Sequence, residues 1–371
     1  MTTALQYPLA AQFRDSARAC APCGPTNARL LAAAADDLDA GGITAEVMAG
    51  HERDRPGSVP GLRFAAAVHR LVLSGQAGQL ASHYPSVGGQ LDESTLWPAA
   101  QKVIAANVDQ LRATVQSTSV QTNEPGRSAP LFGGLLVAAE RAAAHAGRPE
   151  PFPVRLLEVG ASAGLNLRPH LVRYRLPDGS ALGDPDGEFT LDVDWTGLPP
   201  ADLDRPLTVV QRGACDLDPV DVATVDGQLR LASFVWPDQT DRLRRLAGAM
   251  RLARTDPVRI DRAAGAEWLT GRLARRRRGV LTVVWHSVVW QYVPASERAH
   301  GQQVVAQAAA RATADAPLAL LVYESRRVSP PGEPDRFRFD LLLRLWPAGL
   351  SVRLGHGSGH GIPFEWAEQP W

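Results

Sequence analysis

The stretch from Pro153 to Leu167 holds an acid, a serine and two glycines at the point where a buried strand meets a turn. Its apolar run, 154–159, has turn-forming residues at both ends, which is typical of a strand covered on both faces. Gly160 and Gly164 bracket a tight bend whose backbone amides can approach a ligand. We therefore predict a ligand-binding or catalytic corner at this position.

Three chemistries use such a corner. A dinucleotide site needs G-x-G-x-x-G, which Gly160-x-x-x-Gly164 with Ala161 between matches poorly. A nucleophile elbow needs G-x-S-x-G, which this segment matches with Ser162 at its centre. A site for S-adenosylmethionine needs an acid two positions before the first glycine, and Glu158 supplies it for the cationic end of the ligand. The corner alone leaves the last two chemistries open.

Polar residues near the ends of later strands help to decide between them. Apolar runs predict a second, a third and a fourth strand, which lead to Asp216, Asp261 and His286 in that order. Open α/β sheets bind ligands at the carboxyl ends of their strands. Asp216 is placed to bind ribose hydroxyls, and this order of features favours the S-adenosylmethionine site.

A serine hydrolase with Ser162 as nucleophile remains the alternative, because His356 or His360 suits the residue order of such enzymes. Several strands normally precede a nucleophile elbow, whereas the segment before Pro153 is poor in strand patterns. The elbow helix would also meet Pro169 almost at once. A protein that binds S-adenosylmethionine without methylating a substrate is a further alternative.

A polar turn between two predicted helices is the candidate wall of a pocket for a small-molecule substrate. The turn, 121–127, concentrates planar hydrogen-bonding groups, and Asn123, Glu124 and Arg127 are its candidate substrate-binding residues. Capping of the following helix explains the same residue types equally well.

His286 is the candidate base for an acceptor proton, since histidine titrates near neutrality. The alternative is a histidine that only bonds its neighbouring loop. Gln291 and Tyr292 follow it closely and are candidate substrate-binding residues. Tyr292 is also a candidate catalytic residue.

Four motifs together resemble a bacterial family known only as a domain of unknown function, DUF2332. They are the segments 158–167, 121–127, 212–221 and 286–292. That family is similar to class I S-adenosylmethionine-dependent methyltransferases, which implies that this cofactor is bound. The implied and candidate cofactor-binding residues are Glu158, Gly160, Ala161, Ser162, Gly164, Asp216, Asp261 and His286. One motif departs from the family: its third strand carries Gly-Asp-Ala, whereas this chain has Ile260-Asp-Arg-Ala.

The elements that must position these residues alternate between strand and helix from Pro153 onward. This alternation predicts a doubly wound, Rossmann-like α/β sheet with an antiparallel C-terminal edge, preceded by an N-terminal α-helical domain. Residues 1–127 are the predicted helical cap domain, and 128–371 the predicted methyltransferase-type domain with a hairpin inserted near 175–206. The predicted helices are 26–38 (capped by Thr26), 62–73, 96–115, 128–146, 241–253, 263–273 and 296–314; the predicted strands are 154–159, 207–211, 258–260, 279–285, 318–323 and the antiparallel pair 339–346 and 350–354.

Composition argues against several classes of protein. The 371 residues contain 39 Lys and Arg against 39 Asp and Glu, so nothing steers the chain toward nucleic acid or an anionic membrane. The sequence contains no apolar run of membrane-spanning length and no recognisable secretory signal. We therefore expect a cytoplasmic protein that acts on a small molecule. A homodimer is compatible with the sequence, but no residue identifies an interface.

The three cysteines are too few for a disulfide framework. Cys20 and Cys23 form a lone C-x-x-C, which we interpret as two packing residues near a helix end. His356 and His360 are separated by glycines, which argues against a helical metal site. We predict no metal.

Overall fold

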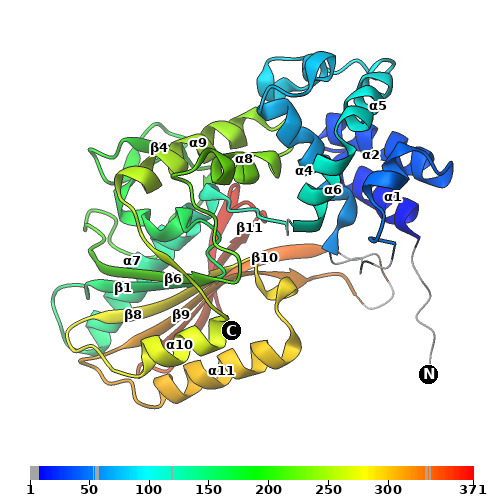
Figure 1. The fold of residues 1–371 in the computed structure, drawn as a ribbon. Helices are drawn as coiled ribbons and strands as arrows, with labels where there is room; N and C mark the ends of the chain where they lie inside the picture. Colours follow the sequence, from blue (N-terminus) through cyan, green and yellow to red (C-terminus); the bar gives the residue numbers. More distant parts are fainter. Residues whose placement is uncertain (1–7, 53, 55–57, 118–119, 331–332, 334–335) are drawn as a thin grey trace. The chain divides into compact units, whose positions relative to one another are not determined.

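The computed structural model describes residues 8–52, 54, 58–117, 120–330, 333 and 336–371 (Figure 1). The chain divides into two compact units. The helical unit comprises Met1–Thr122 and Asp221–Ala247, and the sheet unit comprises Asn123–Val220 and Gly248–Trp371. Residues 221–247 thus pack with the N-terminal helices, although they follow a strand of the sheet unit in sequence.

The helical unit contains no strand in the part of it that the structure describes. Its helices are α1 (Leu9–Cys20), α2 (Pro25–Asp39), α3 (Ile43–Val47), α4 (Pro60–Leu73), η2 (Gly78–His83), η3 (Pro85–Val87), α5 (Leu96–Ala106), α6 (Val108–Ser117) and α8 (Val225–Ser233). Its core is formed by large apolar side chains such as Phe13, Leu30 and Phe64, all of them buried. The helices predicted at 26–38 and 62–73 are confirmed as α2 and α4.

Two details of these predictions are wrong. The single helix expected over 96–115 is two helices, because the chain breaks at Asn107, whose side-chain amide donates to the carbonyl of Val103. Thr26 does not cap α2, since the residue before that helix is Gly24. The Thr26 hydroxyl donates instead to Asp238 Oδ1 at 2.8 Å.

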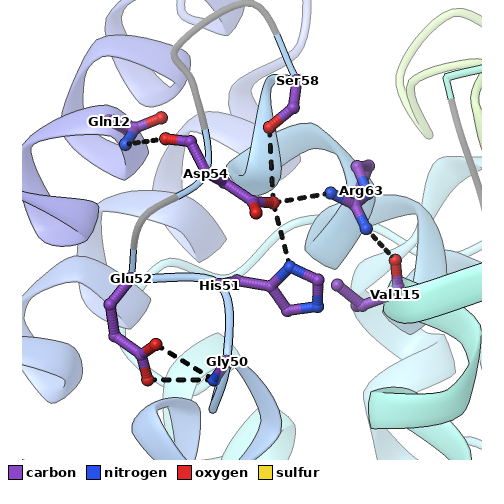
Figure 2. Close-up of polar contacts among 8 residues, drawn as sticks. All are labelled: Gln12, Gly50, His51, Glu52, Asp54, Ser58, Arg63 and Val115. Carbon is purple, nitrogen blue, oxygen red and sulfur yellow. Dashed lines mark hydrogen bonds and ion pairs between the residues drawn. The ribbon is translucent and has the colours of Figure 1, made fainter.

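A polar cluster in the helical unit lies around Asp54 (Figure 2). Asp54 Oδ2 lies 2.9 Å from His51 Nδ1 and accepts from the guanidinium of Arg63 at 2.9 Å. The Ser58 hydroxyl donates to the same oxygen at 3.4 Å. Arg63 also donates to the carbonyl of Val115, at the end of α6. The cluster therefore ties the segment after α3 to α4 and α6.

The sheet unit carries the strands and their covering helices. The elements are η4 (Pro125–Arg127), α7 (Ser128–His145), β1 (Val154–Val159), η5 (Leu165–Leu167), η6 (Pro169–Leu171), β2 (Val172–Arg175), β3 (Ala181–Gly183), β4 (Phe189–Asp192), β5 (Trp195–Thr196), β6 (Val209–Asp216), β7 (Ile260–Arg262), α10 (Gly265–Leu273), β8 (Leu281–Ser287), η7 (Trp290–Tyr292), α11 (Ala295–Ala309), β9 (Leu318–Arg327), β10 (Phe337–Trp346), β11 (Leu350–Gly357) and β12 (Phe364–Pro370). Helix α9 (Thr240–Thr255) runs from the helical unit into this one.

The main sheet has nine strands in the order β5-β12-β11-β10-β9-β8-β1-β6-β7. Strands β7, β6, β1, β8 and β9 are parallel, and β10, β11 and β12 continue as an antiparallel meander. The prediction of a mixed α/β fold with an N-terminal helical region is confirmed. The predicted antiparallel pair is β10 and β11, and β12 is an additional strand.

Helices cover both faces of this sheet (Figure 1). Leu157, Val284 and Leu320 lie side by side on three strands and form one core with residues of α10 and α11. On the opposite face, α7 packs so closely that a Cβ at Gly134 would lie 2.9 Å from the Leu321 side chain. Because side chains alternate along a strand, each residue of the sheet can be assigned to the α10–α11 face or to the α7 face.

The inserted segment differs from the predicted hairpin. Strands β2, β3 and β4 form a separate sheet in the order β3-β2-β4, in which β4 pairs with β2 in parallel. The next strand of the inserted segment, β5, begins at Trp195 and pairs with β12 at the edge of the main sheet. The turn patterns indicated short strands. Which strands pair with one another depends on the burial of apolar residues such as Phe189 and Trp195 against segments that are distant in sequence.

Two expectations from composition can be compared with the structure. Cys20 is buried, whereas Cys23 is exposed, so the interpretation of both as packing residues is correct for Cys20 and wrong for Cys23. Among the described helices, none combines the length and the apolar character that crossing a bilayer requires.

Candidate functional site

The candidate site lies where the order of the parallel strands reverses. From β1 the chain passes to β6 and β7 on one side, then returns to β8 and β9 on the other. The two connections leave the sheet in opposite directions at the carboxyl ends of β1 and β8. In open α/β sheets this arrangement creates the crevice in which ligands bind.

Glu158 is the buried acid of this position. It pairs in register with Trp285 of β8 and Ala214 of β6, and only 2% of it is exposed. Burial raises the pKa of its carboxyl to about 8, against the opposing effects of the Trp285 indole and the positive charges of Arg127 and Arg168. Its Oε2 has no hydrogen-bond partner among the described residues. The carboxyl is therefore poised to meet a polar or cationic group.

The bend after β1 is held by two polar side chains. Asp216 ends β6, and its Oδ2 accepts the backbone N–H of Ser162 at 2.8 Å. Asn123 Oδ1 accepts the N–H groups of Ala163 and Leu165 at 3.2 and 3.1 Å. These bonds stabilise Ser162 in a left-handed conformation with φ 54°, which is uncommon for a residue with a side chain.

The glycines of the bend face neighbouring side chains. A Cβ at Gly160 would lie 2.4 Å from the Val289 side chain, and one at Gly164 would lie 2.7 Å from Ile260. Both glycines also have positive φ, 70° and 66°. Glycine is thus required here by backbone conformation and by close packing against the loop after β8 and the first residue of β7. Ala161, between them, is fully buried.

The helix that a pyrophosphate site requires does not follow this bend. Leu165–Leu167 and Pro169–Leu171 are two short 3₁₀ turns, and the chain then enters β2. Pro169 restricts the chain as the sequence indicated. A dinucleotide phosphate would therefore find no helix N-terminus after Gly164.

Asp261, the acid of the third parallel strand, is engaged with α10. Its Oδ2 accepts from the Trp268 indole at 2.8 Å and from Arg272 at 2.6 Å. Hydrogen bonds from these two side chains lower the pKa of Asp261 below its usual value. These contacts within the protein engage the Asp261 carboxylate and give no direct support for its predicted role as a cofactor-binding residue.

His286 forms a close pair with Glu324. The Nδ1 of His286 lies 2.8 Å from Glu324 Oε1. The same oxygen accepts the backbone N–H groups of Val289 at 3.0 Å and Trp290 at 3.3 Å. The imidazole stacks on the Trp290 ring, with centroids 4.5 Å apart and planes 13° from parallel. His286 is thus fixed through Nδ1 and through its ring face.

The candidate residues divide between the two faces of the sheet. The side chains of Leu157 and Cys215 pack toward α10 and α11. Because side chains alternate along a strand, those of their neighbours Glu158 and Asp216 point to the opposite face. Glu158 and Asp216 therefore share the α7 face. His286 lies two residues after Val284 on β8, so its side chain points to the same face as that of Val284, the α10–α11 face. Groups from the two faces can meet only beyond the strand ends.

The candidate substrate-binding residues fall into two groups. Asn123, Glu124 and Arg127 are buried and serve the local fold. Glu124 accepts the Gly126 N–H at 3.2 Å and lies 3.6 Å from His360 Nδ1, and Arg127 donates to the carbonyl of Gly359 at 2.9 Å. The bonds of these residues fit the capping-and-turn alternative.

The second group lies at the surface. Gln291 and Tyr292 are exposed, and 53% of Tyr292 is accessible. They occupy η7, whose first residue, Trp290, donates its backbone N–H to Glu324. These two side chains are accessible to an acceptor molecule.

Sequence reasoning assigned no role to Glu324 and Arg168. Glu324 lies within β9, at the carboxyl ends of the parallel strands, so the rule that selected Asp216 and Asp261 also points to it. Arg168 is 2% exposed and donates to the carbonyl of Gly164 at 2.9 Å. Its role depends on a distant loop and has no local sequence signal.

The surroundings of Ser162 differ from those of a nucleophile. Its hydroxyl is buried, and no described residue forms a hydrogen bond with it. His356 lies 3.5 Å from Glu365, and His360 lies near Glu124, so each of these histidines has an acid of its own. In the part of the chain that the structure describes, no three His, Cys, Asp or Glu residues are grouped as a metal site requires.

Comparison with known proteins gives a single kind of match. No curated protein and no solved structure matches the chain. A family model described as an uncharacterized protein conserved in bacteria (DUF2332) matches residues 10–366. The match covers both units and all of the motifs considered above. The chain therefore belongs to the DUF2332 family of bacterial proteins.

Proposed function

We propose that the sheet unit binds S-adenosylmethionine at the carboxyl ends of β1 and β6 and catalyses methyl transfer to a small molecule. The order of the five parallel strands supports this proposal. Numbered along the chain, they lie in the order third, second, first, fourth, fifth, as in doubly wound, Rossmann-like sheets that bind nucleotides. The reversal point of such sheets lies beside the first strand, which here carries Glu158.

The observation that carries the proposal is a concentration of unpaired polar atoms on the bend. Glu158 Oε2, Ser162 Oγ and Asn166 Nδ2 are buried, and each is without a hydrogen-bond partner among the described residues. The indole of Trp285, on the neighbouring strand, interacts with the Glu158 carboxyl and opposes the rise of its pKa. Buried polar atoms are ordinarily paired, so a polar ligand fits this set. Its acceptor and donors suit an amino-acid group.

The residues have distinct roles in this proposal. A carboxylate at Glu158 attracts a cationic group and pairs with it through charge-assisted hydrogen bonds. Asp216 accepts one backbone N–H on each oxygen, and each carboxylate oxygen keeps a further lone pair for a ribose hydroxyl. Because Gly160 faces Val289, the proposal places the polar contacts at Glu158 and Asp216, while the glycines shape the bend.

Bound S-adenosylmethionine would supply a methyl group on a sulfonium centre. The remaining requirements are orientation of the acceptor and removal of its proton. His286 is the proposed base, acting through Nε2 because Nδ1 faces Glu324. Gln291 and Tyr292, both exposed on η7, are proposed to contact the acceptor.

Titration calorimetry tests this proposal with S-adenosylmethionine, its demethylated product and NAD. We expect both adenosyl ligands to bind and NAD not to bind. Glu158→Gln should weaken binding of S-adenosylmethionine at least roughly tenfold, because glutamine, unlike the buried glutamic acid, cannot release a proton and carry the charge that meets the cation. Glu365→Gln, which changes a half-exposed acid of the same sheet, is the matched control. Absence of binding to the wild-type protein would overturn the proposal.

A serine hydrolase remains the second candidate, since Ser162 combines the G-x-S-x-G spacing with a strained backbone. A nucleophile elbow also needs a base at the serine hydroxyl. If Ser162→Ala abolished hydrolysis of a p-nitrophenyl ester by the protein while Glu158→Gln left that hydrolysis unchanged, the hydrolase would replace the methyltransferase.

A further inference from the structure

The environment of Glu324 has a consequence for His286. We propose that Glu324 is a positioning residue, which fixes the tautomer of His286 and holds the loop after β8 against the bend at Gly160. It lies on β9, next to β8 in the sheet, and its side chain is 12% exposed. This inference deepens the proposed function, on which the catalytic meaning of His286 rests.

The tautomer follows from hydrogen-bond chemistry. An ionised carboxylate only accepts hydrogen bonds, so the 2.8 Å contact with Glu324 Oε1 requires a proton on Nδ1 of His286. A neutral imidazole then has a free lone pair on Nε2. Free histidine does not hold this tautomer by itself, and a second group that bonds one nitrogen sets the role of the other. Glu324 thereby makes Nε2 the basic nitrogen.

The loop is held by the same carboxylate. Glu324 Oε1 accepts the N–H of Val289, and both of its oxygens lie 3.3 Å from the N–H of Trp290. Val288, just before them, has φ 52°, a costly conformation for a β-branched residue. The contacts at Glu324 offset that cost. They also hold the Val289 side chain against Gly160.

The charge balance distinguishes this acid from an ordinary ion-pair partner. Within the described residues, no Lys or Arg side chain lies within ion-pair distance of Glu324. The nearby Arg298 donates to the carbonyl of Trp290 at 3.3 Å. The negative charge of Glu324 is therefore shared between one imidazole and two backbone N–H groups. Such a charge supports a positive charge that forms on His286 during proton transfer.

Nitrogen NMR of histidine-labelled protein tests the assignment without any ligand. At the alkaline end of a pH series, where the nitrogen shifts themselves show a neutral ring, the wild-type His286 signal should show the Nδ1–H tautomer. In Glu324→Ala the same signal should shift to the Nε2–H tautomer or to a mixture. Glu324→Gln should retain Nδ1–H, because an amide oxygen still accepts it. His356, which pairs with Glu365, is the internal control and should not change.

Amide hydrogen exchange tests the second role. Exchange at Val289 and Trp290 should become roughly tenfold faster or more in Glu324→Ala, because their acceptor is removed. Faster exchange with an unchanged His286 tautomer would overturn the positioning role and leave a loop clamp only. A changed tautomer with unchanged exchange would overturn the loop clamp. Circular dichroism establishes that the variant is folded.

These measurements separate this inference from the proposed function. If the wild-type protein does not bind S-adenosylmethionine, the proposed function fails, whereas the NMR result still decides how Glu324 acts on His286. If the cofactor binds but the wild-type His286 signal shows Nε2–H, the inference fails together with the role of Nε2 as base, whereas the proposed cofactor site stands.

Discussion

Two carboxylate–histidine pairs, one in each unit, have nearly the same geometry and different surroundings. His51 Nδ1 lies 2.9 Å from Asp54, and His286 Nδ1 lies 2.8 Å from Glu324. Asp54 also accepts from the Arg63 guanidinium, which balances its charge (Figure 2). Among the residues that the structure describes, Glu324 has only backbone N–H groups beside its histidine. We therefore propose that the pair serves structure in the helical unit and chemistry in the sheet unit.

This difference shows that contact geometry alone does not identify a functional pair. The informative quantity is the charge balance around the acid. At Asp54 the histidine is one of several partners of the carboxylate, and the Arg63 guanidinium balances the charge of that carboxylate. At Glu324 the histidine is the only titratable partner among the described residues. The predictions below test this distinction, starting with the largest expected effect.

Glu158 extends the comparison to a buried acid without a histidine. Its pKa rises from 4.5 to about 8, so the folded protein retains a proton that the unfolded chain loses between these pH values. The wild-type protein should therefore lose stability as pH rises from 4.5 to about 8, by an amount on the order of 4 kcal/mol. Glu158→Gln should lack this component. Urea unfolding between pH 4.5 and 9 measures it, and equal pH dependence of both proteins would contradict it.

Asp54→Ala should destabilise the helical unit by about 3 kcal/mol, because the Arg63 guanidinium then loses the Asp54 carboxylate in a largely buried position. The side chain of Arg63 is only 10% exposed. The midpoint of urea unfolding provides the measurement. Asp36→Ala, in an exposed pair with Arg14 that Asp39 also serves, should cost less than about 1 kcal/mol. Equal costs at Asp36 and Asp54 would remove the structural role of the buried cluster.

Glu324→Ala should cost less than Asp54→Ala, about 2 kcal/mol, because it removes charge-assisted hydrogen bonds but takes no carboxylate away from a buried guanidinium. Its main effect should be on the His286 tautomer. The same unfolding experiment measures the cost. A loss of stability larger than that of Asp54→Ala would show that Glu324 is mainly a structural residue, and the two pairs would then not differ in role.

Ser162→Ala should have the smallest effect. Removing an unpaired buried hydroxyl changes stability by less than about 0.5 kcal/mol, since no hydrogen bond is lost. Binding of S-adenosylmethionine should weaken by less than roughly tenfold, because a hydroxyl offers the ligand one uncharged hydrogen bond. Calorimetry and thermal unfolding provide both values. A loss of binding as large as that of Glu158→Gln would contradict the leading role of the Glu158 charge.

Local patterns were sufficient to predict several elements that carry the site. The apolar run before Gly160 predicts β1, and the spacing of Phe64, Val68, Leu71 and Val72 predicts α4. These predictions succeed because burial requires a periodicity that a short segment shows by itself. The order of acids along consecutive strands likewise placed Asp216 near the bend, where it bonds to Ser162.

The sequence by itself thus determined which residue types stand at the carboxyl end of each strand. Tertiary structure alone decided which of them meet. Side chains alternate across the sheet, so a one-residue difference in register sends Glu158 to the α7 face and His286 to the other. Asp261 is turned to α10 by Trp268 and Arg272, and His286 finds Glu324 across 38 residues of chain. Such pairings depend on packing between distant segments, which no local pattern encodes.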